Sequence, residues 1–448
     1  MSNKNLQNKQ QKQKGIDLKQ EQVKVEEQQE KNKENDSKFT NPIIEHLLTP
    51  GGKITKEEYD NWAYRPHTIT VIIILAILAI YFSMIHPVED RLASYRVALA
   101  AGIIAFLVFS MLFFSDGILI RPHAYFWRLL KGMSVVFLIF NVFILFLSRD
   151  EARKVYKFID PSLGVPLPEK SYATDCRIYT PEDPESKFKN VKEAFFDIFI
   201  IAHSTGWYGK ALVIRDNLML WVISILFEFL ELTFQHMLEN FKECWWDHII
   251  LDVFGCNLIG IVAGMWTCKI LNMKSYDWTV KAKKSESKAV RAFSFFIPES
   301  WASYDWKIFS SPKRLLYWIG LVIILELVDI NSFWIKYPLW IPPNNPLVYG
   351  RLIFWGFIGL AAVREYYEFA TNPNVHRIGA QTWLCIGILI VETLQGIKFG
   401  KGLYPNPMPK VVKISWAIGL SVLTIGFTIH FTIQHYRQKN AKKVAKEK

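Results

Sequence analysis

Ten stretches of apolar residues, each close to the length of a membrane-crossing helix, dominate this sequence of 448 residues. A helix needs about 20 residues to cross the hydrocarbon layer of a bilayer. Unlike irregular backbone, a helix satisfies its own hydrogen bonds there. The chain is therefore predicted to be an all-α, polytopic membrane protein with about ten transmembrane helices, at residues 68–85, 97–114, 126–147, 194–214, 218–238, 249–271, 315–334, 349–370, 382–397 and 414–433.

The polar segments divide the chain into a membrane domain at 41–434 and two tails. Residues 1–40 are rich in Lys, Gln, Glu and Asn and contain almost no large apolar side chain, so we expect a disordered tail. Lys and Arg concentrate in the tail at 435–448 and in the loop at 272–314, which the positive-inside rule places in the cytoplasm. With ten spans, both termini are cytoplasmic and the long loop at 148–192 is lumenal.

The fourth span decides this topology, because every later segment changes side if it does not cross. Asp197, Gly206 and Lys210 interrupt its apolar sequence, so a re-entrant or broken segment is the alternative. Cys176 and Cys244 both face the lumen if all ten segments span. The sequence leaves open whether they form a disulfide, because it fixes no distance between them.

The net charge of +12 is accounted for by the basic cytoplasmic segments and by affinity for anionic lipid surfaces. No nucleic-acid-binding module is recognisable, so nucleic acid is not an expected partner. The five cysteines show neither a CxxC pair nor zinc-finger spacing, which argues against a zinc site.

Acidic and amide side chains cluster between residues 228 and 257, within and beside two predicted spans. An ionisable side chain at the bilayer centre costs about 2.5 to 3.5 kcal/mol on insertion scales, so several together require a cation, an aqueous cavity or a function. Residues three or four apart in the sequence are neighbours on one face of a helix. The two glutamates of the first span are three residues apart, and His248 and Asp252 of the second span are four apart. Oxygen ligands without thiolates favour a hard cation such as Ca²⁺. The predicted metal ligands are Glu228, Glu231, Asp252 and Asn257.

His203 is the candidate general base or nucleophile, because it is predicted to lie within the membrane beside these acids and imidazole titrates near neutrality. Further catalytic candidates lie in the connection between the two spans, where pairing with interfacial cations is the structural alternative. These are Asn240, Glu243 and Asp247. His236 and His248 rank second because they lie nearer the interface. Gly260 and Gly264 form a GxxxG motif, which predicts close approach of a neighbouring helix.

A hard metal beside a histidine in the membrane favours chemistry on a lipid phosphate, where a cation neutralises charge. Asp116 and Gly117 begin like the CDP-alcohol phosphotransferase signature, but three later positions that should be Gly, Asp and Asp are Leu130, Ser134 and Leu138. A multipass cation transporter or channel is an alternative, since intramembrane acids also mark ion pathways. A lipid-binding or scrambling protein is another.

Over about residues 61–400, the sequence resembles the eukaryotic base-exchange phosphatidylserine synthases. The resemblance rests on long, specific strings, among them Arg121-Pro122-His123, Phe196-Asp197-Ile198-Phe199, Glu243-Cys244-Trp245-Trp246-Asp247 and Ile397-Lys398-Phe399-Gly400. It implies a transferase of the endoplasmic-reticulum membrane that needs Ca²⁺ and no nucleotide. This enzyme would exchange the choline or ethanolamine headgroup of phosphatidylcholine or phosphatidylethanolamine for L-serine.

The resemblance also implies roles for individual residues. All eight catalytic and metal-binding candidates match activity-critical positions of the family. Four further residues match positions tied to feedback by the product phosphatidylserine, with simple interface anchoring as the alternative: Arg121, Arg291, Arg364 and Gln381. A homodimer is compatible with the resemblance. The preferred donor lipid, the number of metal ions, and the choice between a covalent intermediate and direct displacement stay open.

Overall fold

The computed structural model describes residues 68–85, 90–119, 123–167, 175–183, 186–195, 198–238, 241–273, 304–404 and 406–446. The predicted tail at 1–40 and most of the basic loop at 272–314 lie outside these ranges, as do three predicted site residues, Arg121, Asn240 and Arg291. The chain divides into two compact units, residues 1–87 and 88–448. Each unit is described by itself.

The described part of the first unit is one apolar helix, α4 (Thr68–Ile80), which continues as the π-helical turn η1 (Tyr81–Ile85). Its large side chains, such as Ile73, Ile77 and Phe82, are half or more exposed. Such exposure of apolar side chains is expected where a helix faces lipid.

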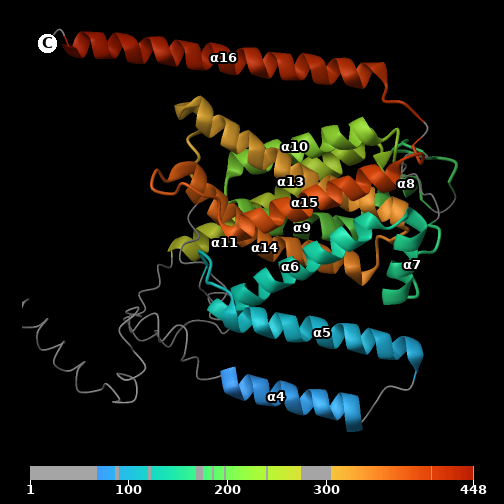
Figure 1. Ribbon diagram of the computed structural model, residues 1–448. Helices are drawn as coiled ribbons and strands as arrows, with labels where there is room; N and C mark the ends of the chain where they lie inside the picture. Colours follow the sequence, from blue (N-terminus) through green and yellow to red (C-terminus); the bar gives the residue numbers. More distant parts are fainter. Residues whose placement is uncertain are drawn as a thin grey trace, which may run out of the picture. The chain divides into compact units, whose positions relative to one another are not determined.

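Helices are the only regular secondary structure among the described residues of the second unit, and no strand occurs there, which confirms the all-α prediction (Figure 1). Its helices are α5 (Arg91–Phe113), α6 (Ala124–Phe146), α7 (Arg149–Ile159), α8 (Lys189–Phe195), α9 (Ile198–Ile214), α10 (Asn217–Phe234), the π-helix η3 (Asp247–Asn257), α11 (Leu258–Met273), the 3₁₀ turn η4 (Ile308–Ser310), α13 (Pro312–Leu339), α14 (Pro346–Thr371), α15 (Ala380–Gly400) and α16 (Lys410–Lys446).

All ten predicted spans coincide with helices. In the described part of the chain, eight helices are long and apolar enough to cross a membrane, η3 and α11 counting as one. The other two predicted spans correspond to α4 with η1 and to α9, which has 17 residues. The sequence did not predict α7, a short amphipathic helix in the loop at 148–192 that buries Ala152 and Tyr156.

The uncertain fourth span, 194–214, includes the last two residues of α8 and all of α9. Asp197 lies outside the described residues, and α9 runs without a break through Gly206 and Lys210. At its C-terminal end, the Arg215 carbonyl accepts a hydrogen bond of 3.1 Å from the backbone N–H of Tyr304, just before α13. At the other end of α13, the Pro338 carbonyl accepts from Arg153 of α7. The contacts thus join loops that the ten-span topology assigns to the same side of the membrane.

The GxxxG motif of α11 packs directly against α9. A Cβ atom on Gly260 would lie 2.5 Å from the Ser204 carbonyl oxygen, and one on Gly264 would lie 2.5 Å from Ala211 Cβ. Any larger residue would therefore push the two helices apart. The predicted close approach is confirmed, with α9 as the partner helix.

Buried polar contacts fix α15 between its neighbours. Arg351 of α14 forms a bidentate ion pair with Glu392 of α15, with one N–O distance of 2.6 Å. Gln395 donates a hydrogen bond of 2.6 Å to the backbone carbonyl of Asn141 on α6. Such pairs satisfy polar groups that lipid cannot solvate.

Cys176 and Cys244 form a disulfide, with their Cα atoms 5.3 Å apart. The pairing that the sequence left open is thereby resolved. The bond ties the segment before α8 to the connection between α10 and η3, next to Glu243. It therefore holds this connection in place beside the acidic cluster.

Candidate active site and metal centre

Helix α10 carries two glutamates into the interior of the helical unit. Asp216 caps the start of α10 by accepting a hydrogen bond from the backbone N–H of Met219. Three turns later, Glu228 and Glu231 follow each other by three residues, so they lie on one face of the helix. Both are buried, with 7% and 5% exposure. Burial at this depth requires partners for the two carboxylates.

The facing side chains come from η3, whose π-helical backbone the sequence does not signal. Single π-helical segments within helices often occur at functional sites. This one runs from Asp247 to Asn257 and buries His248, Asp252 and Asn257. Asn257 donates a hydrogen bond of 2.9 Å to Ser224 of α10, which ties the two helices together.

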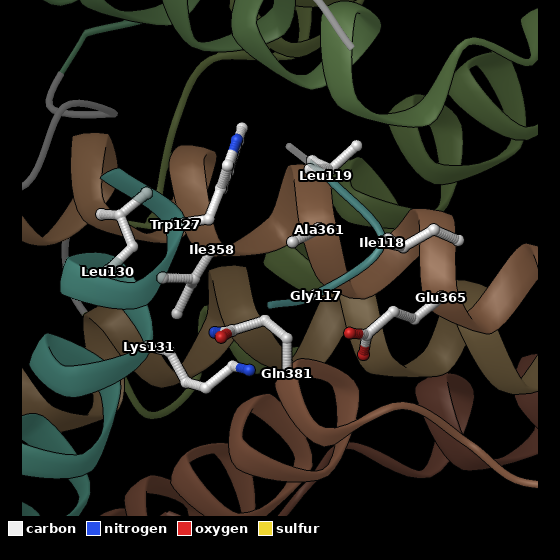
Figure 2. A pocket seen from close by; sticks show the side chains of 10 residues that line it. All are labelled: Gly117, Ile118, Leu119, Trp127, Leu130, Lys131, Ile358, Ala361, Glu365 and Gln381. Atoms are coloured by element: carbon white, nitrogen blue, oxygen red, sulfur yellow. The ribbon is translucent and has the colours of Figure 1, made fainter. Parts of the chain in front are cut away.

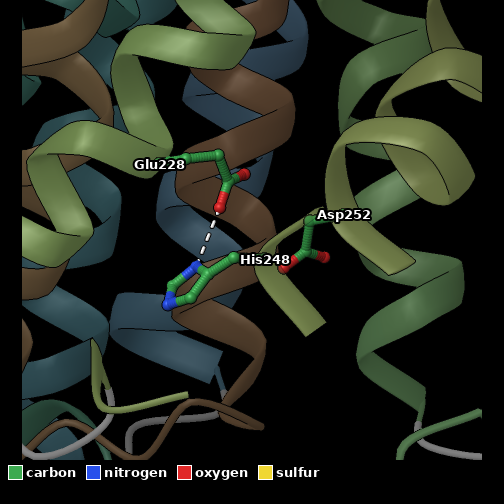
Figure 3. Close-up of side chains that lie close together, drawn as sticks. All are labelled: Glu228, His248 and Asp252. Carbon is green, nitrogen blue, oxygen red and sulfur yellow. Dashed lines mark hydrogen bonds and ion pairs between the residues drawn. The ribbon is translucent and has the colours of Figure 1, made fainter. Parts of the chain in front are cut away.

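His248 lies at the centre of the acidic cluster. Its Nδ1 atom is 2.9 Å from Glu228 Oε2, as the dashed line in Figure 3 shows. The same nitrogen lies 3.4 Å from Glu231 Oε2 and 3.8 Å from Glu243 Oε2. Asp252 lies beside this pair, and one ligand atom from each of Glu228, His248 and Asp252 falls within 4.8 Å of the others.

The connection between α10 and η3 contributes Glu243, beside the disulfide. Burial, together with the neighbouring carboxylates of Glu231 and Asp252, raises the pKa of Glu243 to about 9. Asp247 is half-buried at the start of η3. Glu243 thus belongs to the cluster through its contact with His248.

His203 of α9 approaches the cluster at Asp252. Its Nδ1 atom lies 3.5 Å from Asp252 Oδ1. The imidazole remains 29% exposed, whereas the acids of α10 are almost fully buried. Asp252 therefore stands between the histidine of α9 and the cluster around His248.

The donor set fits a cation. Glu228, His248 and Asp252 form one group that could hold a metal ion, and Glu231, Glu243 and His248 form a second. Two buried oxygen atoms, Glu228 Oε1 and Asn257 Oδ1, have no hydrogen-bond partner among the described residues. Buried acceptors without partners are costly, and a bound cation would remove that cost.

The structure thus brings three of the four predicted metal ligands, Glu228, Glu231 and Asp252, into one cluster. Sequence reasoning missed the central place of His248, which it ranked second for its nearness to the interface. The signal was available, because His248 and Asp252 are four residues apart. The fourth predicted ligand, Asn257, instead bonds to Ser224, which lies one turn before Glu228 on α10.

Of the four predicted regulatory residues, only Arg364 and Gln381 lie in the described part of the chain. Gln381 lines a pocket between α6, α14 and α15 together with Lys131 and Glu365 (Figure 2). Its amide donates a hydrogen bond of 2.9 Å to Ser134. Arg364 instead pairs with Glu368 one turn along α14, at 2.7 Å.

These features define a class: a polytopic helical membrane protein whose buried, acid-rich centre contains one histidine and lies beside a second. The family model described as phosphatidyl serine synthase matches residues 122–400, and the chain belongs to that family.

The relatives cover most of the chain. CDP-diacylglycerol–serine O-phosphatidyltransferase 2 of Oryza sativa subsp. japonica is 42% identical over 86% of this chain and 94% of its own. Phosphatidylserine synthase 2 of Homo sapiens is 38% identical over 85% of this chain and 79% of its own. Phosphatidylserine synthase 1 of Danio rerio is 36% identical over 81% of this chain and 77% of its own. The chain is accordingly a phosphatidyltransferase of phosphatidylserine synthesis.

Proposed function

We propose that the protein makes phosphatidylserine by base exchange, in which L-serine displaces choline or ethanolamine from a phospholipid. The observation that carries this proposal is the cluster of Glu228, Glu231 and Asp252 with His203 beside it, inside a helical membrane domain. It offers a cation site and a base at the same place, which are the two needs of displacement at a lipid phosphate.

Ca²⁺ is the cation we propose for this centre. Glu228, Glu231 and Asp252, with Asn257, would supply the oxygen ligands that calcium prefers. When bound, the ion would neutralise charge on the lipid phosphate. Imidazole is a poor ligand for so hard an ion, so we expect His248 to orient the carboxylates.

His203 acts on serine in one of two ways. As a general base, it takes the proton of the serine hydroxyl while that oxygen bonds to phosphorus and the headgroup alcohol leaves with a proton. As a nucleophile, its nitrogen bonds to the lipid phosphorus while the headgroup oxygen leaves and takes up a proton. The serine hydroxyl then loses its proton and bonds to phosphorus, which releases the imidazole from the phosphatidyl-histidine. Asp252, 3.5 Å from the ring, orients the imidazole in both versions. The polar side chains of Asn240, Glu243 and Asp247 would form the rest of the catalytic site.

Rapid quenching separates the two routes. Enzyme mixed with labelled phospholipid, without serine, accumulates an acid-labile phosphatidyl-enzyme only in the nucleophilic route. A matched His203→Asn sample shows whether any label depends on the imidazole. Absence of label in the unaltered enzyme, with exchange intact, rules out the covalent route.

CDP-diacylglycerol is the alternative donor, because the plant relatives carry it in their names. The chain lacks the CDP-alcohol phosphotransferase signature. Two positions where that signature requires Asp are Ser134 and Leu138 in this chain, and Ser134 accepts a hydrogen bond from Gln381. Asp116, which matches the signature, is held by Arg128 through bonds of 2.6 and 2.9 Å. These observations favour base exchange.

The choice between donors is tested with purified protein in detergent. One sample receives phosphatidylcholine or phosphatidylethanolamine with serine and Ca²⁺, and the other receives CDP-diacylglycerol with serine. We expect product in the first sample only, and its loss with a chelator or in Glu228→Gln protein that elutes at the normal size. Product from CDP-diacylglycerol alone would overturn the proposal. A transporter would show cation flux without new lipid.

The proposed location is the endoplasmic-reticulum membrane, with both termini in the cytoplasm and the disulfide in the lumen. The Cys176–Cys244 bond supports this side, because disulfides persist in the lumen and not in the cytosol. Glycosylation sites inserted at residue 170 and after residue 440 test the topology. Modification at the first site alone is expected, and modification at the second contradicts it.

We also propose that phosphatidylserine restrains the enzyme through Arg121, Arg291, Arg364 and Gln381, and that the protein forms a homodimer. Gln381 and Lys131 line the same pocket, and their N–H donors would suit the phosphate or carboxylate of a lipid headgroup. Gln381→Leu should then reduce inhibition by added phosphatidylserine. Equal inhibition of both proteins would remove Gln381 from this role. Native mass measurement in detergent tests the dimer.

A further inference from the structure

A second buried polar cluster lies between α9 and α13, and the mechanism above does not use it. Lys210 of α9 forms an ion pair of 2.7 Å with Asp329 of α13. Glu326, three residues before Asp329, is only 5% exposed. Neither of its carboxylate oxygens has a hydrogen-bond partner in the described part of the chain. A buried carboxylate without donors is costly, so Glu326 requires an explanation.

This cluster adjoins the candidate active site. Lys210 follows His203 by seven residues, or two turns, so both side chains lie along one stripe of α9. The ammonium of Lys210 lies 4.0 Å from the ring centroid of Trp207 and 5.7 Å from that of Phe227, the residue before Glu228. Glu326 lies within electrostatic range of Lys210 and Glu228. The cluster therefore lies two turns along α9 from the candidate base and within electrostatic range of the acidic centre.

The charges and donors of the cluster specify its ligand. Two carboxyl groups face one ammonium, so a second, bound ammonium group would balance the charge of an ionised Glu326. The unpartnered oxygens of Glu326 also need N–H or O–H donors, and a primary ammonium supplies three, whereas a trimethylammonium such as choline supplies none. Lys210 has donors beyond the one directed at Asp329, and these suit a carboxylate.

We propose that this cluster is the subsite for the amino acid part of serine, with Glu326 receiving its ammonium group and Lys210, held by Asp329, receiving its carboxylate. The inference rests on the proposed phosphatidyl transfer to serine. It applies whichever lipid is the donor, because it concerns only the accepting alcohol. It gives the site a means to prefer serine over other alcohols.

Three acceptor alcohols test the two contacts separately: L-serine has both groups, ethanolamine has only the ammonium, and 3-hydroxypropanoate has only the carboxylate. Glu326→Gln should raise KM about tenfold or more for serine and ethanolamine and leave turnover of 3-hydroxypropanoate unchanged. Lys210→Gln should raise KM for serine and 3-hydroxypropanoate but not for ethanolamine. Glu151→Gln, in an exposed ion pair on α7, is the matched control.

Two results would overturn the subsite: an unchanged KM for serine in Glu326→Gln, or an equal loss with all three alcohols. If Glu326→Gln does not fold, competition experiments on the unaltered enzyme still test whether an ammonium group binds there. Ethylammonium should then raise the apparent KM for serine without changing kcat, whereas ethanol should not; equal effects of the two refute the proposal. Failure of the proposed function is distinguishable, because the unaltered enzyme would then make no phosphatidylserine at all.

Discussion

Replacing Gly260 with alanine should separate the two helices that bring His203 to Asp252. The added Cβ atom would lie 2.5 Å from the Ser204 carbonyl oxygen and 2.7 Å from Trp207 Cβ. An ordinary contact is about 3.5 Å, so α11 and α9 must part by about 1 Å. Overpacking of this kind costs about 1 to 3 kcal/mol of stability. Because His203 directly precedes Ser204, the same shift lengthens its 3.5 Å approach to Asp252.

Misplacement of a catalytic group by about 1 Å costs on the order of 100-fold in rate, so we expect that loss in Gly260→Ala. The assay measures incorporation of labelled serine into lipid by purified protein of confirmed size. Gly209→Ala is the control, because Gly209 lies on α9, the helix that faces Gly260, and its Cβ atom would meet nothing within 4 Å. Full activity in Gly260→Ala, or the same loss in both variants, would refute the reasoning.

Three further substitutions test the cluster and the helix contacts around it. Glu228→Gln should reduce exchange by at least about 100-fold and raise the Ca²⁺ concentration for half-maximal activity, and an unchanged calcium response would exclude Glu228 as a ligand. Cys176→Ser removes a disulfide that closes a loop of 68 residues, and the loop-entropy model predicts a loss of about 4 kcal/mol of folding stability. We expect a lower Tm, and reductant should lower the Tm of the unaltered protein in the same way. Arg351→Met leaves Glu392 buried without its partner and should cost about 3 to 5 kcal/mol, whereas adding Glu392→Leu should restore most of it; no recovery would argue against a buried-charge penalty.

The membrane fold could be predicted from the sequence because bilayer thickness and hydrogen bonding leave few solutions for long apolar segments. The glutamates of α10 could also be placed, since helical spacing puts residues three apart on one face. The GxxxG motif indicated a close helix contact, and the structure identifies α9 as the partner. Each of these predictions depends on spacing within a single helix.

The remaining features depend on contacts between segments far apart in the sequence. The π-helical backbone of η3 has no sequence signal here, and it helps to place His248 among the glutamates of α10. The ion pair of Lys210 with Asp329 joins positions more than 100 residues apart, so no periodicity reveals it. The same holds for the disulfide, whose spacing permits but does not require a bond.

The stoichiometry of the reaction tests the central claim most directly. Purified protein is given phosphatidylcholine, labelled serine and Ca²⁺, with no nucleotide, and free choline and labelled phosphatidylserine are measured over time. Base exchange predicts one choline released for each phosphatidylserine formed, and neither product with a chelator. Phosphatidylserine formed without choline release, or only after CDP-diacylglycerol is added, would contradict it.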